Sequence, residues 1–413
     1  MVETAGVEQT PVLKRSLSLP MITLYGLGTT IGAGIYVLIG KVAGSAGMYA
    51  PVSFVVASLL AGLTVFSFAE FASRLPKSAG EAIYVHAAFP TKWLALLVGL
   101  GVMFSGLTSS AAIAHGFVGY LHEFVDAPDW LAIVLLACAL GIVAAWGITE
   151  SVTIAVVATV IEIGGLLVAI WAGFDSLADL PARLPELLPP FETSAWSGIL
   201  IGSVLAFYAF IGFEDMVNVA EEVKDVRRNL PRAIIITLIV TTAFYFALSL
   251  IAVLSLPLDE LSASKAPLAM LMDRKASGLS GAISVVAIVA ILNGALIQTV
   301  MAARVLYGLA NQGWLPKILA TIHPTTRTPL LATTIVAALI LVFALLLPLI
   351  LLAEITSFLM LFIFALVNLA LLRIKRRDPT PPDAFVIPLW VPTTGFIAST
   401  GVIVLRFVSV VAG

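Results

Sequence analysis

Apolar runs of about 20 residues recur along almost the whole of this chain. A helix needs about 20 such residues to cross the hydrocarbon core of a bilayer. Only 11% of the residues are charged, against about 25% in a typical soluble domain, and the mean hydropathy is +1.09. So few charges cannot cover a surface that faces water. The sequence therefore predicts an all-α integral membrane protein.

Eleven of these runs have the length that a bilayer demands. We expect transmembrane helices at residues 18–40, 50–73, 93–121, 130–148, 151–173, 197–220, 232–256, 280–308, 328–349, 351–372 and 387–411. No stretch resembles a soluble domain. The expected organisation is a tail at 1–16, a membrane core at 17–375, and a linker with the eleventh helix at 376–413.

Lysine and arginine set the expected orientation, because cytoplasmic loops carry an excess of both. With the N-terminus in the cytoplasm, about 16 of the 22 lysines and arginines fall on the inner side. We therefore expect a multi-pass protein of the cell (inner or plasma) membrane, with its C-terminus outside. The formal net charge of -2 gives no sign of nucleic-acid binding.

Two of the runs contain residues that weaken a helix in its middle. The first carries five glycines between Tyr25 and Gly40, and each costs a helix about 1 kcal/mol relative to alanine. The sixth carries Gly212, followed at once by Glu214 and Asp215. Interruptions at matching places in two halves are typical of transporters built from inverted repeats. We expect a five-plus-five repeat, at about 17–173 and 197–375, with helices 1 and 6 broken.

An interrupted helix exposes polar backbone groups that can bind a ligand. Free N–H groups at the start of a half-helix attract an anion, and free carbonyl groups at the end of another attract a cation. The carboxylate and ammonium of an amino acid match this pair of charges. One alternative is that Gly28 and Gly32 form a GxxxG pair for close helix packing. A phosphate-binding glycine loop does not fit, because that motif follows a strand.

Four stretches together resemble the amino acid–polyamine–organocation (APC) superfamily, and within it the permeases related to cationic amino acid transporters. They are GTTIGAGIYVL (28–38), AEFASRLPKSAGEAIYVHAAF (69–89), FYAFIGFEDMVNVAEEVKDVRRNLPRAI (207–234) and AARVLYGLANQGWLPKILATIHPTTRTP (302–329). The resemblance implies the same five-plus-five fold and alternating access. The family usually has twelve spans, whereas this chain ends after the eleventh expected one.

The resemblance also implies which residues bind the substrate. Its carboxylate would meet N–H groups around Gly32, Ala33 and Gly34. Its ammonium would meet carbonyl groups near Thr30, Tyr208, Ala209 and Ile211. The weaker candidates for pocket lining or gating are Ser105, Ser109, Phe210, Phe213, Asn293 and Ile297. No metal and no cofactor is expected.

Glu162 is the candidate for coupling transport to an ion. Some proton-coupled relatives have a lysine on the fifth helix, but here that helix reads ATVIEIGGLLVAI (158–170) and holds Glu162 instead. An isolated charge at the centre of a bilayer is costly, so a carboxyl group there is suited to binding and releasing a proton. The alternative is a hydrogen-bonded glutamate that fixes helix packing.

For the other acidic residues, a structural or gating role is the alternative to substrate contact. Glu214 and Asp215 are expected to hold the inner half of the sixth helix, or to pair with an arginine, rather than to touch substrate. Glu70 and Arg74 are four residues apart and are expected to pair on the helix surface, as an inner gate or as a plain interfacial pair.

The sequence thus predicts secondary active transport of amino acids with proton coupling, and no enzyme activity, because no nucleophile–base arrangement is present. An amino acid exchanger, a polyamine or organic-amine transporter, and an amino-acid-sensing receptor without transport stay open as alternatives. The expected partners are an amino acid, a proton and the lipid bilayer. The side chain carried, the choice between proton and sodium, and the oligomeric state stay open.

Overall fold

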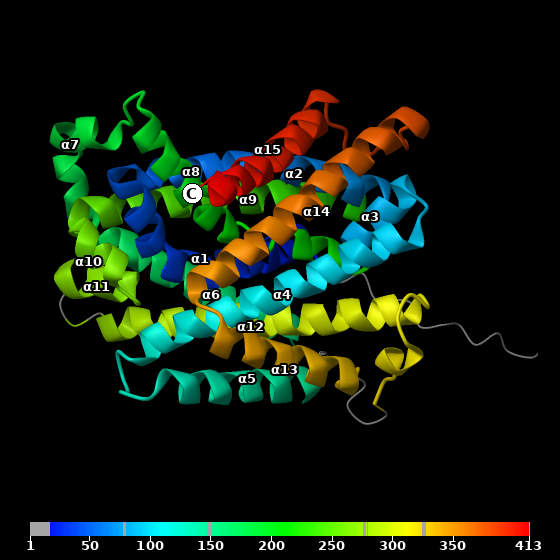
Figure 1. The fold of residues 1–413 in the computed structure, drawn as a ribbon, viewed down its shortest axis with the longest axis horizontal. Coiled ribbons are helices and arrows are strands. Elements are labelled where there is room, and N and C mark those ends of the chain that lie inside the picture. The colour runs from blue at the N-terminus through cyan, green and yellow to red at the C-terminus, as the bar shows by residue number, and fades with distance from the viewer. Residues whose placement is uncertain are drawn as a thin grey trace, which may run out of the picture.

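The computed structural model describes residues 17–76, 80–146, 151–275, 278, 280–323 and 328–412. Over these residues the chain forms a bundle of α-helices joined by short loops (Figure 1). The tail predicted at 1–16 lies outside the described residues.

Among the described residues, eleven long helices overlap the runs predicted from the sequence, and the sixth run extends past α8 into η3. They are α1 (Leu19–Ala46), α2 (Ala50–Arg74), α4 (Lys92–Leu121), α5 (Asp129–Trp146), α6 (Ser151–Ala172), α8 (Thr193–Tyr208), α9 (Val226–Ser255), α12 (Ser280–Asn311), α13 (Leu330–Leu346), α14 (Leu349–Arg377) and α15 (Trp390–Ala412). The short helices are η1 (Gly47–Tyr49), α3 (Gly80–Ala88), η2 (Phe174–Asp179), α7 (Leu180–Leu187), η3 (Phe213–Glu222), α10 (Leu258–Ala263), α11 (Pro267–Lys275) and η4 (Lys317–Ala320).

Length and hydropathy identify the helical segments that can cross a membrane. Among the described residues six segments qualify, or seven when the bent pair Val156–Ala172 and Phe174–Leu187 counts as one. Three shorter apolar helices, Asp129–Ala145, Leu330–Leu346 and Trp390–Leu405, accompany them. The chain is thus a multi-pass membrane protein, and the number of eleven crossings stays a prediction.

The long helices pack in two groups that meet along α1, and α14 of the second group also contacts α8 and α2. In the first group α1 and α2 each pack against α8 and α9. In the second α4 lies between α12 and α14, and α5 runs beside α13 at the edge of the molecule (Figure 1). The helix α15 lies across α14 and α2. The short helices α7, α10 and α11 gather at one end of the bundle, and α3 lies at the other (Figure 1).

The two predicted interruptions are present in the structure. In α1 the backbone leaves helical geometry at Gly32, with φ -23° and ψ -147°. The helix α8 ends at Tyr208, and the chain turns through residues 209–212 before η3 begins. Gly212 has φ 128°, a conformation that favours glycine. Broken first and sixth long helices are therefore confirmed.

Candidate binding site at the helix breaks

The two breaks lie against each other, and glycine makes the close approach possible. A Cβ atom on Gly34 would come within 2.6 Å of Ala209 Cα. A Cβ atom on Gly212 would collide with the carbonyl group of Thr29. Side chains at these two positions would push the breaks apart, which explains why the sequence places glycine there.

Hydrogen bonds hold the breaks together. The hydroxyl of Tyr245, on α9, lies 2.8 Å from the carbonyl oxygens of both Thr30 and Ala209. The Thr29 hydroxyl donates to the Gly212 carbonyl at 2.9 Å. Each of these carbonyls lies at or next to an interruption of the regular helix, where backbone groups can be left without a helical partner. Because a carbonyl oxygen has two lone pairs, those of Thr30 and Ala209 can still accept a hydrogen bond from a ligand.

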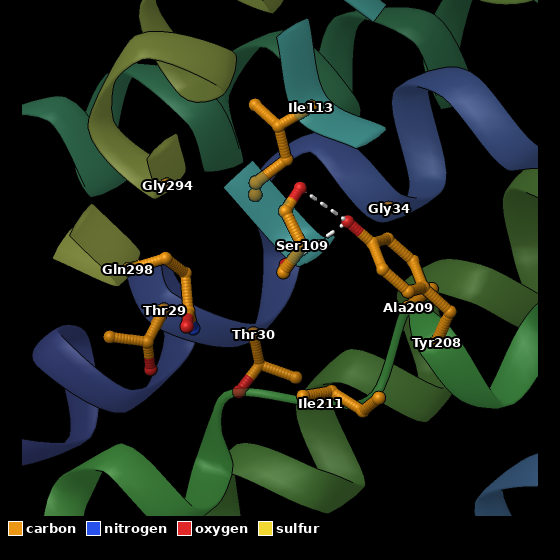
Figure 2. A pocket seen from close by; sticks show the side chains of 11 residues that line it. Thr29, Thr30, Gly34, Ser109, Ile113, Tyr208, Ala209, Ile211, Gly294 and Gln298 are labelled. Carbon is orange, nitrogen blue, oxygen red and sulfur yellow. Dashed lines mark hydrogen bonds between the residues drawn. The ribbon is translucent and has the colours of Figure 1, made fainter. Parts of the chain in front are cut away.

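A small cavity opens beside the breaks (Figure 2). Its lining residues are Thr29, Thr30, Gly32, Gly34, Ser109, Ile113, Tyr208, Ala209, Ile211, Gly294 and Gln298. Its volume is about 330 Å³, counting space open to solvent, and it leaves room for about one water molecule. The cavity is therefore narrow, and its polar groups are mainly backbone, hydroxyl and amide groups.

Most of the residues expected to bind substrate lie around this cavity. Six of the seven predicted from the helix breaks line it, and they are Thr30, Gly32, Gly34, Tyr208, Ala209 and Ile211. The seventh, Ala33, lies in the same turn of α1. Of the weaker candidates, Ser109 lines the cavity, and its hydroxyl lies 3.1 Å from the Tyr208 hydroxyl (Figure 2). That these residues contact a substrate stays a prediction.

The other weaker candidates lie outside the cavity lining. Phe210 packs against the ring of Tyr245, and Phe213 packs against Phe68 and Phe364. Ser105, Asn293 and Ile297 are not among the lining residues.

Four lining residues were missed from the sequence: Thr29, Ile113, Gly294 and Gln298. Gly294 and Gln298 lie four apart on α12 and therefore share one face. Each follows a predicted candidate by one residue, so the cavity-facing side of α12 is displaced by about 100° from the expected side. Gln298 also links the cavity to Asp215, because its amide donates to that carboxylate at 3.0 Å.

Glu162 is buried where α6 packs against α1 and α12. Its side chain has 0% exposure, and Asn293 donates to Oε1 at 3.2 Å. The Tyr36 hydroxyl donates to the backbone carbonyl of Glu162 at 3.1 Å. Oε2 has no hydrogen-bond partner within the part of the chain that the structure describes. No lysine or arginine forms an ion pair with this carboxyl group among the described residues, so its ionised form would be costly there.

Three further carboxyl groups gather behind the second break. Glu214 accepts a hydrogen bond from Gly212 N at 2.9 Å and so caps the turn. Glu81, in the first turn of α3, is close enough for its charge to interact with those of Glu214 and Asp215. Glu81 lies outside the long helices, and burial raises its pKa to about 7. Its Oε1 has no hydrogen-bond partner among the described residues.

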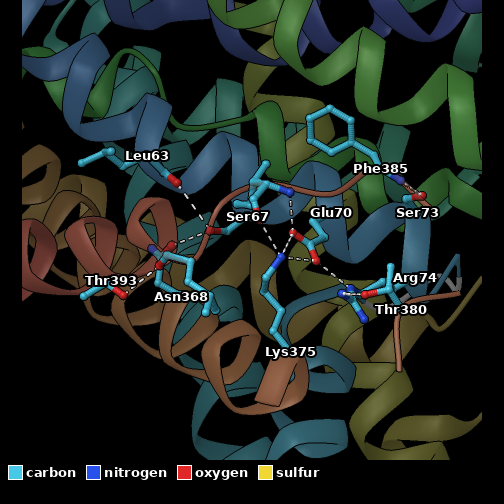
Figure 3. Close-up of polar contacts among 12 residues, drawn as sticks. Leu63, Ser67, Glu70, Ser73, Arg74, Asn368, Lys375, Thr380, Phe385 and Thr393 are labelled. Atoms are coloured by element: carbon cyan, nitrogen blue, oxygen red, sulfur yellow. Dashed lines mark hydrogen bonds and ion pairs between the residues drawn. The ribbon is translucent and has the colours of Figure 1, made fainter. Parts of the chain in front are cut away.

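A buried ionic network ties α2 to α14 and to the segment after it (Figure 3). Glu70 pairs with Arg74 at 2.7 Å and with Lys375 at 2.7 Å. Ile387 N donates to the Glu70 carboxylate at 2.9 Å, and Arg74 donates to the Thr380 hydroxyl at 3.0 Å. The expected pair of Glu70 and Arg74 is thus present. It is buried rather than on the helix surface, because α14 and residues 380–387 cover it.

Two broken apolar helices that face each other around polar backbone groups are typical of membrane transporters. The match to known families is more specific. The family model "Amino acid permease" matches residues 17–412, and the chain belongs to that family.

Three named relatives are similar in sequence over most of this chain. The chain is 28% identical to a branched-chain amino acid permease of Bacillus subtilis, covering 91% of this chain and 84% of the relative. It is 28% identical to a methylthioribose transporter of the same organism (94% and 87% covered). It is 30% identical to a vacuolar cationic amino acid transporter of Arabidopsis thaliana (91% and 65% covered).

A substrate-bound, outward-open Na+-coupled sialic acid symporter has a similar structure, with a TM-score of 0.65. The alignment covers 94% of this chain and 89% of the symporter, at 13% sequence identity. At that identity the likeness concerns the fold alone.

Proposed function

We propose that this protein is a secondary active transporter of amino acids that works by alternating access. The observation that carries the proposal is the cavity between the broken helices, where the backbone of α1 and the turn at 209–212 supply groups of both polarities. N–H groups around Gly32, Ala33 and Gly34 would bind the α-carboxylate. Carbonyl groups of Thr30, Tyr208, Ala209 and Ile211 would bind the α-ammonium.

The lining supports a substrate with a small, uncharged side chain. Ile113, Tyr208 and Ile211 offer an apolar wall, and no ionisable acid or base lines the cavity among the described residues. A cationic side chain would leave its charge unpaired in such a site, which is costly. The relatives' names include both a branched-chain amino acid permease and cationic amino acid transporters, and the uncharged lining favours a neutral substrate.

The narrowness of the cavity fits a site that changes shape in a transport cycle. A volume in which a single water can move does not accept an amino acid without displacement of the lining. The two groups of helices meet at this cavity, so rocking one against the other would widen it toward one side at a time. The distribution of lysine and arginine favours a cytoplasmic N-terminus, which would put α3 on the cytoplasmic side.

Glu162 is the proposed coupling residue. Its carboxyl group is buried beside α1, has one oxygen with no hydrogen-bond partner among the described residues, and would be stable there when protonated. A proton bound from one side and released to the other would couple its gradient to the movement of α1.

The test is uptake of radiolabelled amino acids into proteoliposomes that contain the purified full-length chain. An inward proton gradient is imposed without sodium, and neutral, cationic and acidic amino acids are supplied as separate pools. We expect accumulation of the neutral pool above equilibrium. The matched control is the Gly34→Leu protein, in which the site is blocked.

Other outcomes separate the alternatives. Uptake only into vesicles preloaded with unlabelled amino acid would identify an exchanger. Uptake of the cationic pool alone, or of polyamines alone, would overturn the proposal that the substrate is a neutral amino acid. Binding of an amino acid with no uptake under any gradient would identify a sensor rather than a transporter.

A further inference from the structure

An apolar groove runs along the outside of the bundle between α4 and α14. Trp93, Leu97, Gly101 and Phe104 line it from α4, and Phe362 and Ile363 line it from α14. Its empty volume is about 740 Å³. The side chains are large and partly exposed, with 66% exposure at Trp93 and 43% at Phe362. The groove is separate from the cavity at the helix breaks, with which it shares no residue.

The floor of the groove is formed where the two helices approach most closely. A Cβ atom on Gly101 would lie 3.3 Å from Ile363 Cδ1, so the missing side chain leaves a depression between bulkier neighbours. From Trp93 to Phe104 the groove extends for about 17 Å along the helix. One leaflet of the hydrocarbon core is about 15 Å thick. The groove therefore has the length of a lipid acyl chain in one leaflet.

Two cationic residues lie at one end of the groove. Lys92 is the first residue of α4, nine residues before Gly101. Arg373 lies ten residues after Ile363 on α14, which runs in the opposite direction. At 1.5 Å per residue both are about 14 to 15 Å from the groove floor and so reach the same level. The guanidinium of Arg373 lies 4.8 Å from the ring centroid of Phe89, just before α4, which holds it at this edge.

These cations are available to an anion. Both are exposed, and neither forms a salt bridge within the described ranges of the chain. The nearby Arg377 differs, because its guanidinium already pairs with Asp378 at 2.7 Å. Lys92 and Arg373 lie at the end of the bundle that the distribution of lysine and arginine assigns to the cytoplasm. Anionic lipids give the cytoplasmic leaflet its negative surface potential.

We propose that this groove binds one anionic phospholipid of the cytoplasmic leaflet, with an acyl chain between α4 and α14 and its phosphate between Lys92 and Arg373. Trp93 lies at the level where the headgroup begins, a depth that tryptophan prefers. A second copy of this chain fits less well. A symmetric contact places the same patch of both copies together, and the four cations would then repel one another.

The first test is native mass spectrometry of the purified full-length chain with added phosphatidylglycerol or phosphatidylcholine of identical acyl chains. We expect phosphatidylglycerol to be retained at least tenfold better. The Lys92→Gln/Arg373→Gln double variant should lose this preference. The matched control is Arg228→Gln/Arg232→Gln, which removes two exposed cations of α9 at the same end of the bundle and should keep it.

The second test locates the lipid. Phosphatidylglycerol with a photoreactive group on its acyl chain should label peptides that contain residues 93–104 or 359–363. The single Lys92→Gln variant, which changes only an exposed side chain, provides the same comparison if the double variant fails to fold.

Three results of the two lipid tests would overturn the proposal. They are equal retention of the two lipids by the unmodified chain, an unchanged preference in both the single and double variants, and labelling at other helices. Self-association of the chain through this face, abolished by the double variant, would identify a second copy as the occupant and would also overturn it.

Discussion

The Glu70 carboxylate lies 2.7 Å from the ammonium nitrogen of Lys375, although 305 residues separate them in the chain. The side chains are 0% and 8% exposed. The Lys375 ammonium also donates to the Ile387 carbonyl at 2.7 Å, and Ile387 N donates to the Glu70 carboxylate. One carboxylate thus joins α2, α14 and the segment that leads to α15.

Loss of the Glu70 charge should destabilise the protein strongly. The Glu70→Gln change leaves Lys375 buried beside a neutral group, and breaking a buried pair costs about 3–5 kcal/mol. We expect a clear fall in the midpoint of thermal unfolding in detergent, measured by tryptophan fluorescence. The matched control is Glu260→Gln, whose partner Arg274 is 43% exposed and whose effect should be within about 1 kcal/mol.

The double variant Glu70→Gln/Lys375→Met gives a further check. It removes one of the two buried cations that Glu70→Gln leaves without their carboxylate, Arg74 being the other, so it should be more stable than the single Glu70→Gln variant. Equal unfolding midpoints for Glu70→Gln and Glu260→Gln would show that the network contributes nothing.

Tyr245→Phe should impair transport while the fold remains. The ring still packs against Phe54 and Phe210, at centroid distances of 5.7 and 5.0 Å. The lost hydroxyl no longer bonds the carbonyls of Thr30 and Ala209, and one hydrogen bond is worth about 1 kcal/mol. We expect a fall in initial uptake of about tenfold, which corresponds to about 1.4 kcal/mol in the barrier.

The control for this prediction is Tyr307→Phe on α12, whose hydroxyl has no hydrogen-bond partner in the described part of the chain. Its uptake should equal that of the unmodified chain. If Tyr245→Phe also transports normally, the hydroxyl does not hold the two breaks in a functional arrangement.

Gly34→Leu should abolish uptake. Its Cβ alone would lie 2.6 Å from Ala209 Cα and 2.8 Å from Ala209 Cβ, so a larger side chain displaces the turn that lines the cavity. Gly308→Ala is the control, because a Cβ there meets nothing within 4 Å. Radiolabelled uptake and elution from a size-exclusion column should be measured together. Normal uptake by Gly34→Leu would return this glycine to a packing role.

The helices could be predicted from the sequence because hydropathy and length alone define an apolar span. The breaks could be predicted because Gly32 and Gly212 fall in corresponding runs. The face of α12 that lines the cavity could not be predicted from the sequence. Asn293 and Gly294 differ by one position but by about 100° around the helix, and hydropathy does not fix this angle in a helix that is apolar on all sides.

Contacts between distant parts of the chain were also beyond sequence reasoning. Tyr245 is one aromatic residue in an apolar run, and nothing local indicates that its hydroxyl meets two helix breaks. The spacing of Glu70 and Arg74 predicted their pair correctly. The burial of this pair depends on residues 380–387, which follow α14 and lie over α2.

Glu81 should make stability depend on pH. Its folded-state pKa is about 7, above the value of about 4.3 in an unfolded chain, so the folded protein holds the proton more tightly. This contribution is fully present below about pH 4.3, falls as the pH rises, and is lost once the pH passes about 7. Glu81→Gln keeps a neutral group and should flatten the fall in unfolding midpoint between pH 5 and pH 7.5. An unchanged pH profile would show that Glu81 does not titrate in this range.

Glu162→Gln should separate substrate binding from coupling. The glutamine has nearly the same shape and can still accept the hydrogen bond from Asn293, but it cannot lose or gain a proton. We expect the affinity for substrate, measured by calorimetry in detergent, to change less than about threefold. In proteoliposomes, an inward proton gradient should no longer accelerate uptake, while exchange of internal for external substrate continues. The exposed Glu123→Gln variant is the control and should keep its response to the gradient.

A Glu162→Gln protein that still responds to the gradient would exclude this carboxyl group as the coupling site. If Glu162→Gln lowers both the substrate affinity and the rate of exchange, the role of Glu162 is instead to pack α6 against α1 and α12.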